Sequence, residues 1–389
     1  MSFVNVADAR LLARRRLPRI FFDYIDGGAS AEATLRANEA DFDRHGLRQR
    51  VLVDVRDRDV SANFLGRTHA LPFVLGPVGF TGLFWPAGEI AAATAAARAG
   101  IGFSLSHFAI ATLADIRTRS TGPLYAQLYA LKDRAMIEAL VEQAERQGAD
   151  ALILTVDTAV TGIRERDDRN GFRSLDRLTP GLALRLARKP RWCMQMLAAG
   201  MPQVGVARGR PEFGRGVLAQ ARSLARLIDP GLTWADLGWL RARWPGWLAV
   251  KGILCADDAR RAVAAGADAV IVSNHGGRQL DGASSTVAVL PEIAAAVGHE
   301  VEVLLDGGIR RGTHVAKALA LGANGVLLGR AYAYGLAAAG EAGVARVIEA
   351  IGAELSVTMA LMGVASVAEL RAGGRDLLRP QRRGDATLF

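Results

Sequence analysis

The sequence has few cysteines and no long apolar run. Its 389 residues include two cysteines, Cys193 and Cys255, which cannot form a disulfide framework or a four-ligand zinc site and do not make a CxxC pair. This usage is typical of a reducing compartment. The first sixteen residues contain no secretory-type apolar stretch, and no charge-free apolar run of about 18 residues occurs. We therefore expect a cytoplasmic protein that is neither secreted nor membrane-spanning, and we expect no metal site.

The composition also lacks the features of a disordered chain. Hydrophobic residues make up 50% and charged residues 22%, with only 13 prolines, so the chain can bury a sizeable core. A chain of 389 residues admits two or three domains of roughly 100 to 200 residues or one large α/β barrel. No low-complexity linker divides it, and we expect a single domain over residues 1–389.

The excess of basic charge is confined to one segment. The whole chain has 48 basic and 39 acidic residues, a net charge of +9. Eleven of the basic residues but only two of the acidic ones lie in 173–226, which leaves 37 residues of each sign elsewhere. A neutral body argues against a nucleic-acid-binding protein, whereas a local basic segment suits anionic lipid or phosphate.

Eight short apolar runs bounded by turn residues predict strands, and Ala-rich helical stretches separate most of them. Continuous apolar strands that alternate with helices are typical of a parallel sheet. Eight such units favour a closed (β/α)8 TIM barrel over an open doubly wound sheet. Residues 1–70 then form an N-terminal extension, and the basic segment is a long insertion after the fourth strand. The runs are 71–77, 102–107, 124–130, 151–157, 247–252, 269–275, 301–308 and 325–330.

Polar residues follow these runs, at the end of a barrel where active sites lie. His275 and Arg278 follow the sixth run, Asp157 the fourth and Lys251 the fifth. A carboxylate facing a histidine orients the ring and stabilises imidazolium, as a general base requires, and arginine suits an anionic substrate. The alternative for His275 is a solvated loop histidine. Lys251 is either a Schiff-base nucleophile or a fixed positive charge beside an anionic ligand.

The last two strands are followed by glycine and arginine together, in DGGIR (306–310) and GR (329–330). Loops at these positions of a barrel frequently bind phosphate through glycine amides and arginine donors. A phosphorylated cofactor or substrate is therefore indicated, with simple turn residues as the alternative.

The string SNHGGRQLDG (273–282) resembles the family of FMN-dependent L-2-hydroxy acid oxidases and dehydrogenases. The resemblance covers nearly the whole chain and implies the same barrel fold with FMN as cofactor. Its other motifs, in family order, are LPRIFFDYIDGGA (17–29), QLY (127–129), TVDT (155–158), VKGIL (250–254), DGGIRRG (306–312) and ALALGANGVLLGRA (318–331).

The resemblance implies a role for each matching residue. His275 becomes the catalytic base, Asp157 its partner, and Tyr129 a hydrogen-bonding partner of the reacting oxygen. Lys251 becomes the charge beside the N1 and O2 edge of the flavin, in place of a Schiff-base nucleophile.

Further positions are assigned to substrate and cofactor. Arg278 and Tyr24 would hold the substrate carboxylate, with Arg164 at the edge of the site. Without the resemblance, Tyr24 and Tyr129 would be interpreted as core tyrosines. The implied FMN contacts are Pro77, Val78, Gly79, Ser106, Gln127, Thr155 and Lys251 for the ring, Ser273 nearby, Asp306 for the ribityl chain, and Gly308, Arg310, Gly329 and Arg330 for the phosphate.

The implied reaction oxidises an L-2-hydroxy acid to the 2-keto acid. Gly79 stands where oxidases of the family generally have Ala, so a membrane quinone is favoured over oxygen as electron acceptor. The alternative is a soluble oxidase that makes hydrogen peroxide. A flavin-free barrel that binds lipid or nucleic acid is a third hypothesis, against which the intact polar residues argue.

Substrate preference rests on subgroup features. The segments 76–89, 162–172 and 335–344 resemble mandelate dehydrogenases within the family, while 47–50 also suits respiratory lactate dehydrogenases. Phe108 replaces the Trp of the glycolate oxidase subgroup, which is compatible with a larger apolar substrate group. A mandelate-like substrate is expected first and lactate second.

The segment 180–202 interleaves basic residues with apolar ones, as interfacial membrane segments do. We expect 177–215 to bind an anionic membrane surface, making the protein peripheral on the inner face of the cell membrane. Pro190 excludes one uninterrupted helix here, and an active-site lid is the alternative. A homotetramer is common in the family and is expected.

Overall fold

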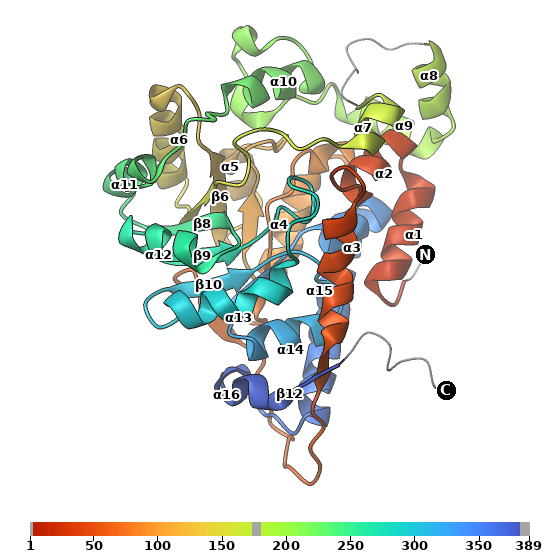
Figure 1. Cartoon of the computed structure of the whole chain (residues 1–389). Coiled ribbons are helices and arrows are strands. Elements are labelled where there is room, and N and C mark those ends of the chain that lie inside the picture. The colour runs from red at the N-terminus through yellow and green to blue at the C-terminus, as the bar shows by residue number, and fades with distance from the viewer. Residues whose placement is uncertain (1–2, 173–179, 382–389) are drawn as a thin grey trace.

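Eight parallel strands close into a barrel in the computed structural model, which describes residues 3–172 and 180–381 (Figure 1). The strand order around the barrel is β10-β11-β4-β5-β6-β7-β8-β9. Each of the eight predicted runs supplies one strand, so the predicted (β/α)8 TIM barrel is confirmed. The strands are β4 (Phe73–Leu75), β5 (Phe103–Leu105), β6 (Leu124–Tyr129), β7 (Ala151–Thr155), β8 (Trp247–Ile253), β9 (Ala269–Val272), β10 (Glu302–Leu305) and β11 (Gly325–Leu328).

Burial on both faces explains why these runs are continuously apolar. Every residue of β6, β7 and β9 is buried, because side chains point alternately into the barrel and toward the helices. The barrel interior contains residues such as Ile153 and Leu304. The antiparallel hairpin of β2 (Ala62–Phe64) and β3 (Arg67–His69) contributes Phe64 and Leu65 to the same cluster. The sequence did not indicate this hairpin.

Helices surround the barrel. They are α4 (Gly88–Arg98), α5 (Leu113–Arg117), α6 (Arg134–Arg146), α11 (Trp234–Arg243), α12 (Ala256–Ala264), α13 (Thr286–Val297), α14 (Gly312–Ala320) and α15 (Arg330–Leu361). The long α15 is kinked at Ala339 and Gly340. Gly340 has a φ of +63°, and a Cβ there would lie 2.5 Å from the Trp85 ring, so the kink depends on glycine.

The N-terminal extension forms α1 (Val6–Arg16), α2 (Arg19–Asp26) and α3 (Ala33–Ala40), with α1 packed along α15. A 3-10 turn (Asp41–Arg44) leads to β1 (His45–Leu47), which pairs with β12 (Leu378–Pro380) after α16 (Val367–Gly373). The extension thus contacts α15 and β12, and α2 lies at the carboxyl-terminal end of the barrel strands.

The insertion between β7 and β8 lies over the carboxyl ends of the strands, at the top of Figure 1. It contains α7 (Glu165–Asn170), α8 (Pro180–Ala187), α9 (Pro190–Ala199) and α10 (Val217–Leu227). The break expected at Pro190 is confirmed, because α8 ends before it and α9 begins with it. Residues 173–179, which include part of the predicted membrane segment, lie outside the described residues.

Helix α9 is docked on the N-terminal extension and on the segment that follows β4. The Trp192 ring lies 5.0 Å from the Phe21 ring, and its indole N–H donates to the Leu83 carbonyl at 2.9 Å. Several apolar side chains of the insertion nevertheless remain largely exposed, namely Leu184, Met194, Leu197 and Met201. Within 3–172 and 180–381, no helix combines the length and apolarity needed to cross a bilayer.

Candidate active site

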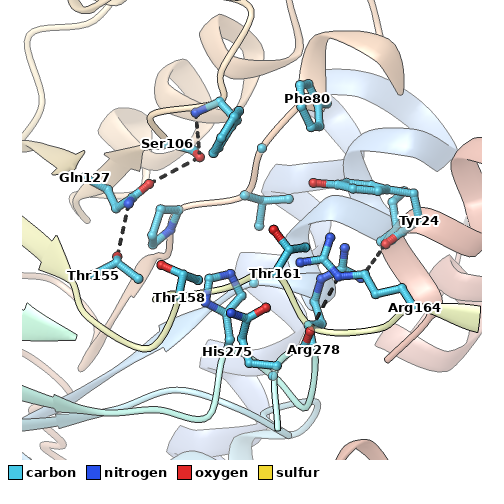
Figure 2. A pocket seen from close by; sticks show the side chains of 18 of the residues that line it. Tyr24, Phe80, Ser106, Gln127, Thr155, Thr158, Thr161, Arg164, His275 and Arg278 are labelled. Carbon is cyan, nitrogen blue, oxygen red and sulfur yellow. Dashed lines mark hydrogen bonds between the residues drawn. The ribbon is translucent and has the colours of Figure 1, made fainter. Parts of the chain in front are cut away.

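A cavity of about 500 Å³ opens at the carboxyl ends of the barrel strands (Figure 2). Eighteen of the twenty predicted site residues line it. The other two, Asp157 and Ser273, lie behind the wall, where each hydrogen-bonds a lining residue. The structure thus brings the predicted residues together at one end of the barrel, and their individual roles remain predictions.

His275 and Asp157 form a pair across two strand ends. The Nδ1 atom of His275 lies 2.8 Å from Oδ1 of Asp157, and His275 has a left-handed φ of +58°, which is uncommon for a residue with a side chain. Because a carboxylate can only accept, the hydrogen sits on Nδ1 and leaves a lone pair on Nε2. Burial lowers the pKa of His275, and the attraction of Asp157, weakened by Lys251 and Arg164, does not offset it. The imidazole is therefore neutral near pH 7 and able to accept a proton.

Two partly buried guanidinium groups lie beside this histidine. NH1 of Arg278 donates to the carbonyls of Tyr24 at 2.6 Å and Gly27 at 2.9 Å, while its NH2 is buried with no hydrogen-bond partner among the described residues. Burial, together with the charge of Arg278, lowers the pKa of Arg164 to about 10. An unsatisfied buried cation is costly. A carboxylate in the cavity would satisfy it.

Lys251 is held as a cation. Its Nζ lies 3.2 Å from Oδ2 of Asp306 and 2.8 Å from Oγ of Ser273. Burial lowers the pKa of Lys251, but Asp306 and Asp157 more than offset this, so the net shift is upward. A protonated amine is not a nucleophile. The contacts therefore favour the fixed-charge alternative over the Schiff base.

A row of polar side chains lines the cavity from the end of β5 to the end of β7 (Figure 2). Thr155, the last of the row, is the strand neighbour of Lys251. Nε2 of Gln127 donates to the Thr155 hydroxyl at 3.0 Å, and the Ser106 hydroxyl donates to Oε1 of Gln127 at 3.4 Å. The backbone of 77–79 forms another part of the wall. This combination of amide, hydroxyl and main-chain groups suits the polar edge of a flat heterocycle.

Two further arginines that line the cavity, Arg330 and Arg310, suit a phosphate. Arg330 donates to the carbonyls of Ile25 at 2.9 Å, Gly276 at 2.8 Å and Gly27 at 2.7 Å, and makes no ion pair among the described residues. It is the first residue of α15, whose N-terminus carries partial positive charge. Burial lowers the pKa of Arg330 to about 10. Arg310 lies in the same wall and pairs with Glu39 at 2.7 Å.

These groups fit FMN. Oδ1 of Asp306 is buried without a partner in the described part of the chain, as an acceptor for a ribityl hydroxyl would be. Arg310, Arg330 and the start of α15 would hold the phosphate, while Lys251 and the polar row would hold the ring. The chemistry that FMN supplies there is the acceptance of two electrons.

Sequence reasoning missed an aromatic wall of the cavity. Phe80 and Phe172 line it together with Tyr24 and Phe108. The Tyr24 ring lies 4.7 Å from that of Phe172 and 5.5 Å from that of Phe80. Phe172 ends one of the segments quoted for the resemblance, but its position beside Tyr24 depends on how α7 packs on α2.

Helix α10 was also missed as part of the site. Leu218, Ala221, Arg222, Ala225 and Arg226 line the cavity. Their spacing of three and four residues places them on one helix face, a pattern that is visible in the sequence. The pattern predicts a helix, but nothing in it says that the face covers an active site. Thr158 and Thr161, in the loop after β7, also line the cavity and were not predicted as site residues.

Comparison with known proteins gives a consistent result. Residues 13–378 match the family model described as FMN-dependent dehydrogenase. An L-lactate dehydrogenase of Caulobacter vibrioides is 45% identical over 372 residues, covering 95% of this chain and 97% of the relative. One of Serratia proteamaculans is 42% identical over 369 residues, covering 94% and 96%.

Comparison with solved structures identifies the same kind of protein. The monotopic membrane protein (S)-mandelate dehydrogenase superposes with a TM-score of 0.93 at 39% identity, covering 98% of this chain and 100% of that one. A mandelate oxidase with (S)-4-hydroxymandelic acid gives a TM-score of 0.84 at 38% identity, covering 97% and 98%. The matches span the barrel, the extension and the insertion, and the chain belongs to the family of FMN-dependent dehydrogenases, with FMN as its cofactor.

Proposed function

We propose that this protein oxidises an L-2-hydroxy acid to the corresponding 2-keto acid. One observation carries the proposal: a neutral histidine with a free Nε2 shares a cavity with an arginine whose buried NH2 has no partner in the described structure. A base next to a carboxylate-binding cation is what the oxidation of a hydroxy acid requires. The lactate and mandelate dehydrogenases among the relatives support the same substrate class.

In this proposal each side chain has one task. Arg278, helped by Arg164 and the Tyr24 hydroxyl, holds the substrate carboxylate, and His275 removes a proton as two electrons leave the substrate. Asp157 stabilises the imidazolium that results. Burial raises the pKa of Tyr129, so its hydroxyl stays protonated and donates to the substrate oxygen. The protonated Lys251 provides a fixed positive charge beside the site that receives the electrons.

The aromatic wall favours a substrate with a large apolar or aromatic group. Tyr24, Phe80, Phe108 and Phe172 surround this part of the cavity, and Leu218 of α10 adds apolar surface. Aromatic pairs pack edge-to-face or offset, and a phenyl group would extend this packing. A mandelate-like acid is therefore the preferred substrate, with lactate second. The names of the relatives divide between these two acids.

A membrane quinone is the proposed acceptor, at the inner face of the cell membrane. The apolar side chains Leu184, Met194, Leu197 and Met201 are 62–83% exposed in a segment that also carries Arg185, Arg188 and Arg191. Exposed apolar anchors between arginines suit an anionic lipid surface, and one structural relative is a monotopic membrane protein. The alternative is an oxidase that passes the electrons to oxygen, and the similarity to a mandelate oxidase supports this alternative.

We also propose that the protein is a homotetramer.

The experiment that tests the proposal is a steady-state assay with the holoenzyme. (S)-mandelate and L-lactate are offered with either a soluble quinone analogue or oxygen, and the 2-keto acid is measured. We expect turnover of the (S)-acid with the quinone analogue and little oxygen consumption. Equal rates with oxygen would establish the oxidase, and no keto acid from a panel of 2-hydroxy acids would refute the proposed reaction.

A further inference from the structure

The two arginines nearest the proposed anion sites are positioned by the same short stretch of main chain. Arg278 donates to the carbonyls of Tyr24 and Gly27, and Arg330 donates to those of Ile25 and Gly27. Carbonyl acceptors place a guanidinium without neutralising it, which leaves its charge available for an anion. Arg330 also donates to the Gly276 carbonyl, but residues 24–27 supply both acceptors of Arg278 and two of the three acceptors of Arg330, so the location of this stretch helps to set the location of both cations.

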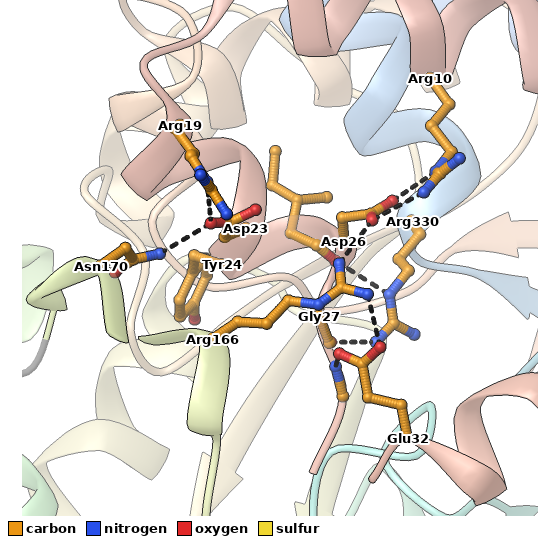
Figure 3. Close-up of polar contacts among 12 residues, drawn as sticks. Arg10, Arg19, Asp23, Tyr24, Asp26, Gly27, Glu32, Arg166, Asn170 and Arg330 are labelled. Atoms are coloured by element: carbon orange, nitrogen blue, oxygen red, sulfur yellow. Dashed lines mark hydrogen bonds and ion pairs between the residues drawn. The ribbon is translucent and has the colours of Figure 1, made fainter. Parts of the chain in front are cut away.

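This stretch begins in the last turn of a helix and continues into glycine. It lies at the end of the eight-residue helix α2 and runs directly into Gly27 and Gly28. Glycines lose much conformational freedom on folding, and a chain containing two of them needs external anchors. One anchor in this structure is the side chain of Asp26, which points away from the carbonyls on either side of it (Figure 3).

Asp26 is held by three different elements. Arg10 of α1 donates to it through Nε and NH2, at 2.5 and 2.8 Å. NH1 of Arg166 in α7 donates at 2.9 Å, and the Tyr334 hydroxyl of α15 donates at 2.8 Å. Burial raises the pKa of Asp26, but these donors outweigh burial and bring it to about 2. The carboxylate is thus ionised at every pH at which the enzyme would work.

A second carboxylate completes the same network. NH2 of Arg166 also pairs with Glu32, whose Oε1 accepts from the Gly28 amide at 2.9 Å. Arg166 thereby joins both ends of the glycine pair, and it belongs to the helix that opens the insertion (Figure 3).

We propose that Asp26 is a positioning residue for the reaction: through residues 24–27 it holds Arg278 for the substrate carboxylate and Arg330 for the cofactor phosphate. The inference rests on the proposed function, because that function assigns the carboxylate to Arg278. Asp26 itself does not line the cavity, so it acts through the two arginines.

The test compares two isosteric variants on the same helix. Asp26→Asn removes the charge that Arg10 and Arg166 bind, and both arginine side chains are at least 36% exposed, so they can turn to water and the variant should fold. Asp23→Asn is the matched control, because Asp23 is also buried in α2 and binds Arg19 and Asn170, both at 3.2 Å, but neither Arg10 nor Arg166. Thermal unfolding of both holoenzymes shows whether the fold is equally affected.

Two readouts are independent of turnover. One is the dissociation constant of benzoate, a carboxylate without the reacting hydroxyl, measured by its perturbation of the flavin spectrum. The other is the rate at which FMN fluorescence appears on dilution of the holoenzyme. For Asp26→Asn we expect benzoate to bind about tenfold more weakly and FMN to leave about tenfold faster, the effect of misplacing one charge-assisted contact at each site. For Asp23→Asn we expect changes of less than about twofold, as for a contact outside the network.

A benzoate dissociation constant and a rate of FMN release that stay at wild-type values in Asp26→Asn would overturn the inference. Equal changes of both readouts in Asp23→Asn would also overturn it, because Asp26 would then be only a general stabiliser of α2. If no 2-hydroxy acid is oxidised by the wild-type protein, the proposed function fails, while the rate of FMN release still decides the role of Asp26 toward Arg330.

Discussion

Nδ1 of His275, after β9, lies 2.8 Å from Oδ1 of Asp157, after β7. The two residues are 118 positions apart in the chain, and they meet because strand ends of a closed barrel share one face. Asp157 fixes the tautomer and leaves Nε2 facing the cavity as the acceptor. The predictions about the reaction follow from this pair and its surroundings.

The first prediction concerns pH. The pKa of His275 is lowered from the usual 6.5, chiefly by burial. A protonated imidazole cannot accept the substrate proton, so kcat/KM should be constant above this pKa and fall as the pH drops below it. Because Asp157 raises the pKa of His275, Asp157→Asn should move the inflection to lower pH and reduce kcat about 100-fold. A profile that falls instead with rising pH near 7 would contradict a neutral base.

Gly79 permits a close approach of the aromatic wall. A Cβ at this position would lie 3.1 Å from Cβ of Phe108 and 3.4 Å from the Tyr24 hydroxyl. Gly79→Ala should push Phe108 into the cavity, so that kcat/KM for (S)-mandelate falls several-fold more than for L-lactate. By the family resemblance, oxygen consumption should rise. Gly181→Ala is the control, because no atom lies within 4 Å of a Cβ there. An unchanged ratio of kcat/KM between the two acids would count against binding of the apolar group of the substrate at the aromatic wall.

Most of the fold was predictable because the barrel strands are apolar throughout, a pattern set by burial on both faces. The cavity was predictable where polar side chains follow those strands. The contacts of Arg278 and Arg330 were not, since their acceptors are main-chain carbonyls, which carry no sequence signal. The position of α10 was not predictable either, because it depends on tertiary packing of the insertion. The family resemblance places Lys251 at the flavin ring and Asp306 at the ribityl chain, and the structure shows that the two side chains form an ion pair.

Glu302, near the hairpin at the other end of the barrel, should make stability depend on pH. Burial raises its pKa from 4.5 to about 7, although the hydrogen bond that the carboxylate accepts from the Leu65 amide at 2.7 Å acts to lower it. A carboxyl group with a raised folded-state pKa stabilises at low pH and loses this contribution as the pH rises from its unfolded value through about 7. Glu302→Gln keeps an acceptor for Leu65 and should raise Tm at pH 8 but leave it nearly unchanged at pH 5.

The control for this prediction is Glu300→Gln, at an exposed position two residues away. It should leave the difference in Tm between the two pH values as in the wild type. A Glu302→Gln protein that loses stability equally at both pH values would show that the carboxyl group is not protonated on folding.

The insertion should bind membranes through its exposed apolar side chains. Leu197 and Met201 are 80% and 83% exposed, so replacing both with Gln should leave the fold intact and weaken binding to vesicles containing anionic lipid about tenfold or more. Trp192→Gln is an unsuitable variant, because Trp192 is packed on Phe21. Sedimentation with the vesicles measures the binding. Undiminished binding by the double variant would favour the lid alternative.

The most direct test of the central claim is the visible spectrum of the holoenzyme, recorded without oxygen before and after addition of (S)-mandelate, with L-lactate in parallel. The wild-type flavin spectrum should bleach rapidly with one acid, and His275→Gln should keep its FMN but bleach about a thousandfold more slowly, as expected when a general base is lost. Bleaching of His275→Gln at the wild-type rate would contradict the assignment of the base, and a wild-type spectrum that no 2-hydroxy acid changes would contradict the proposed reaction.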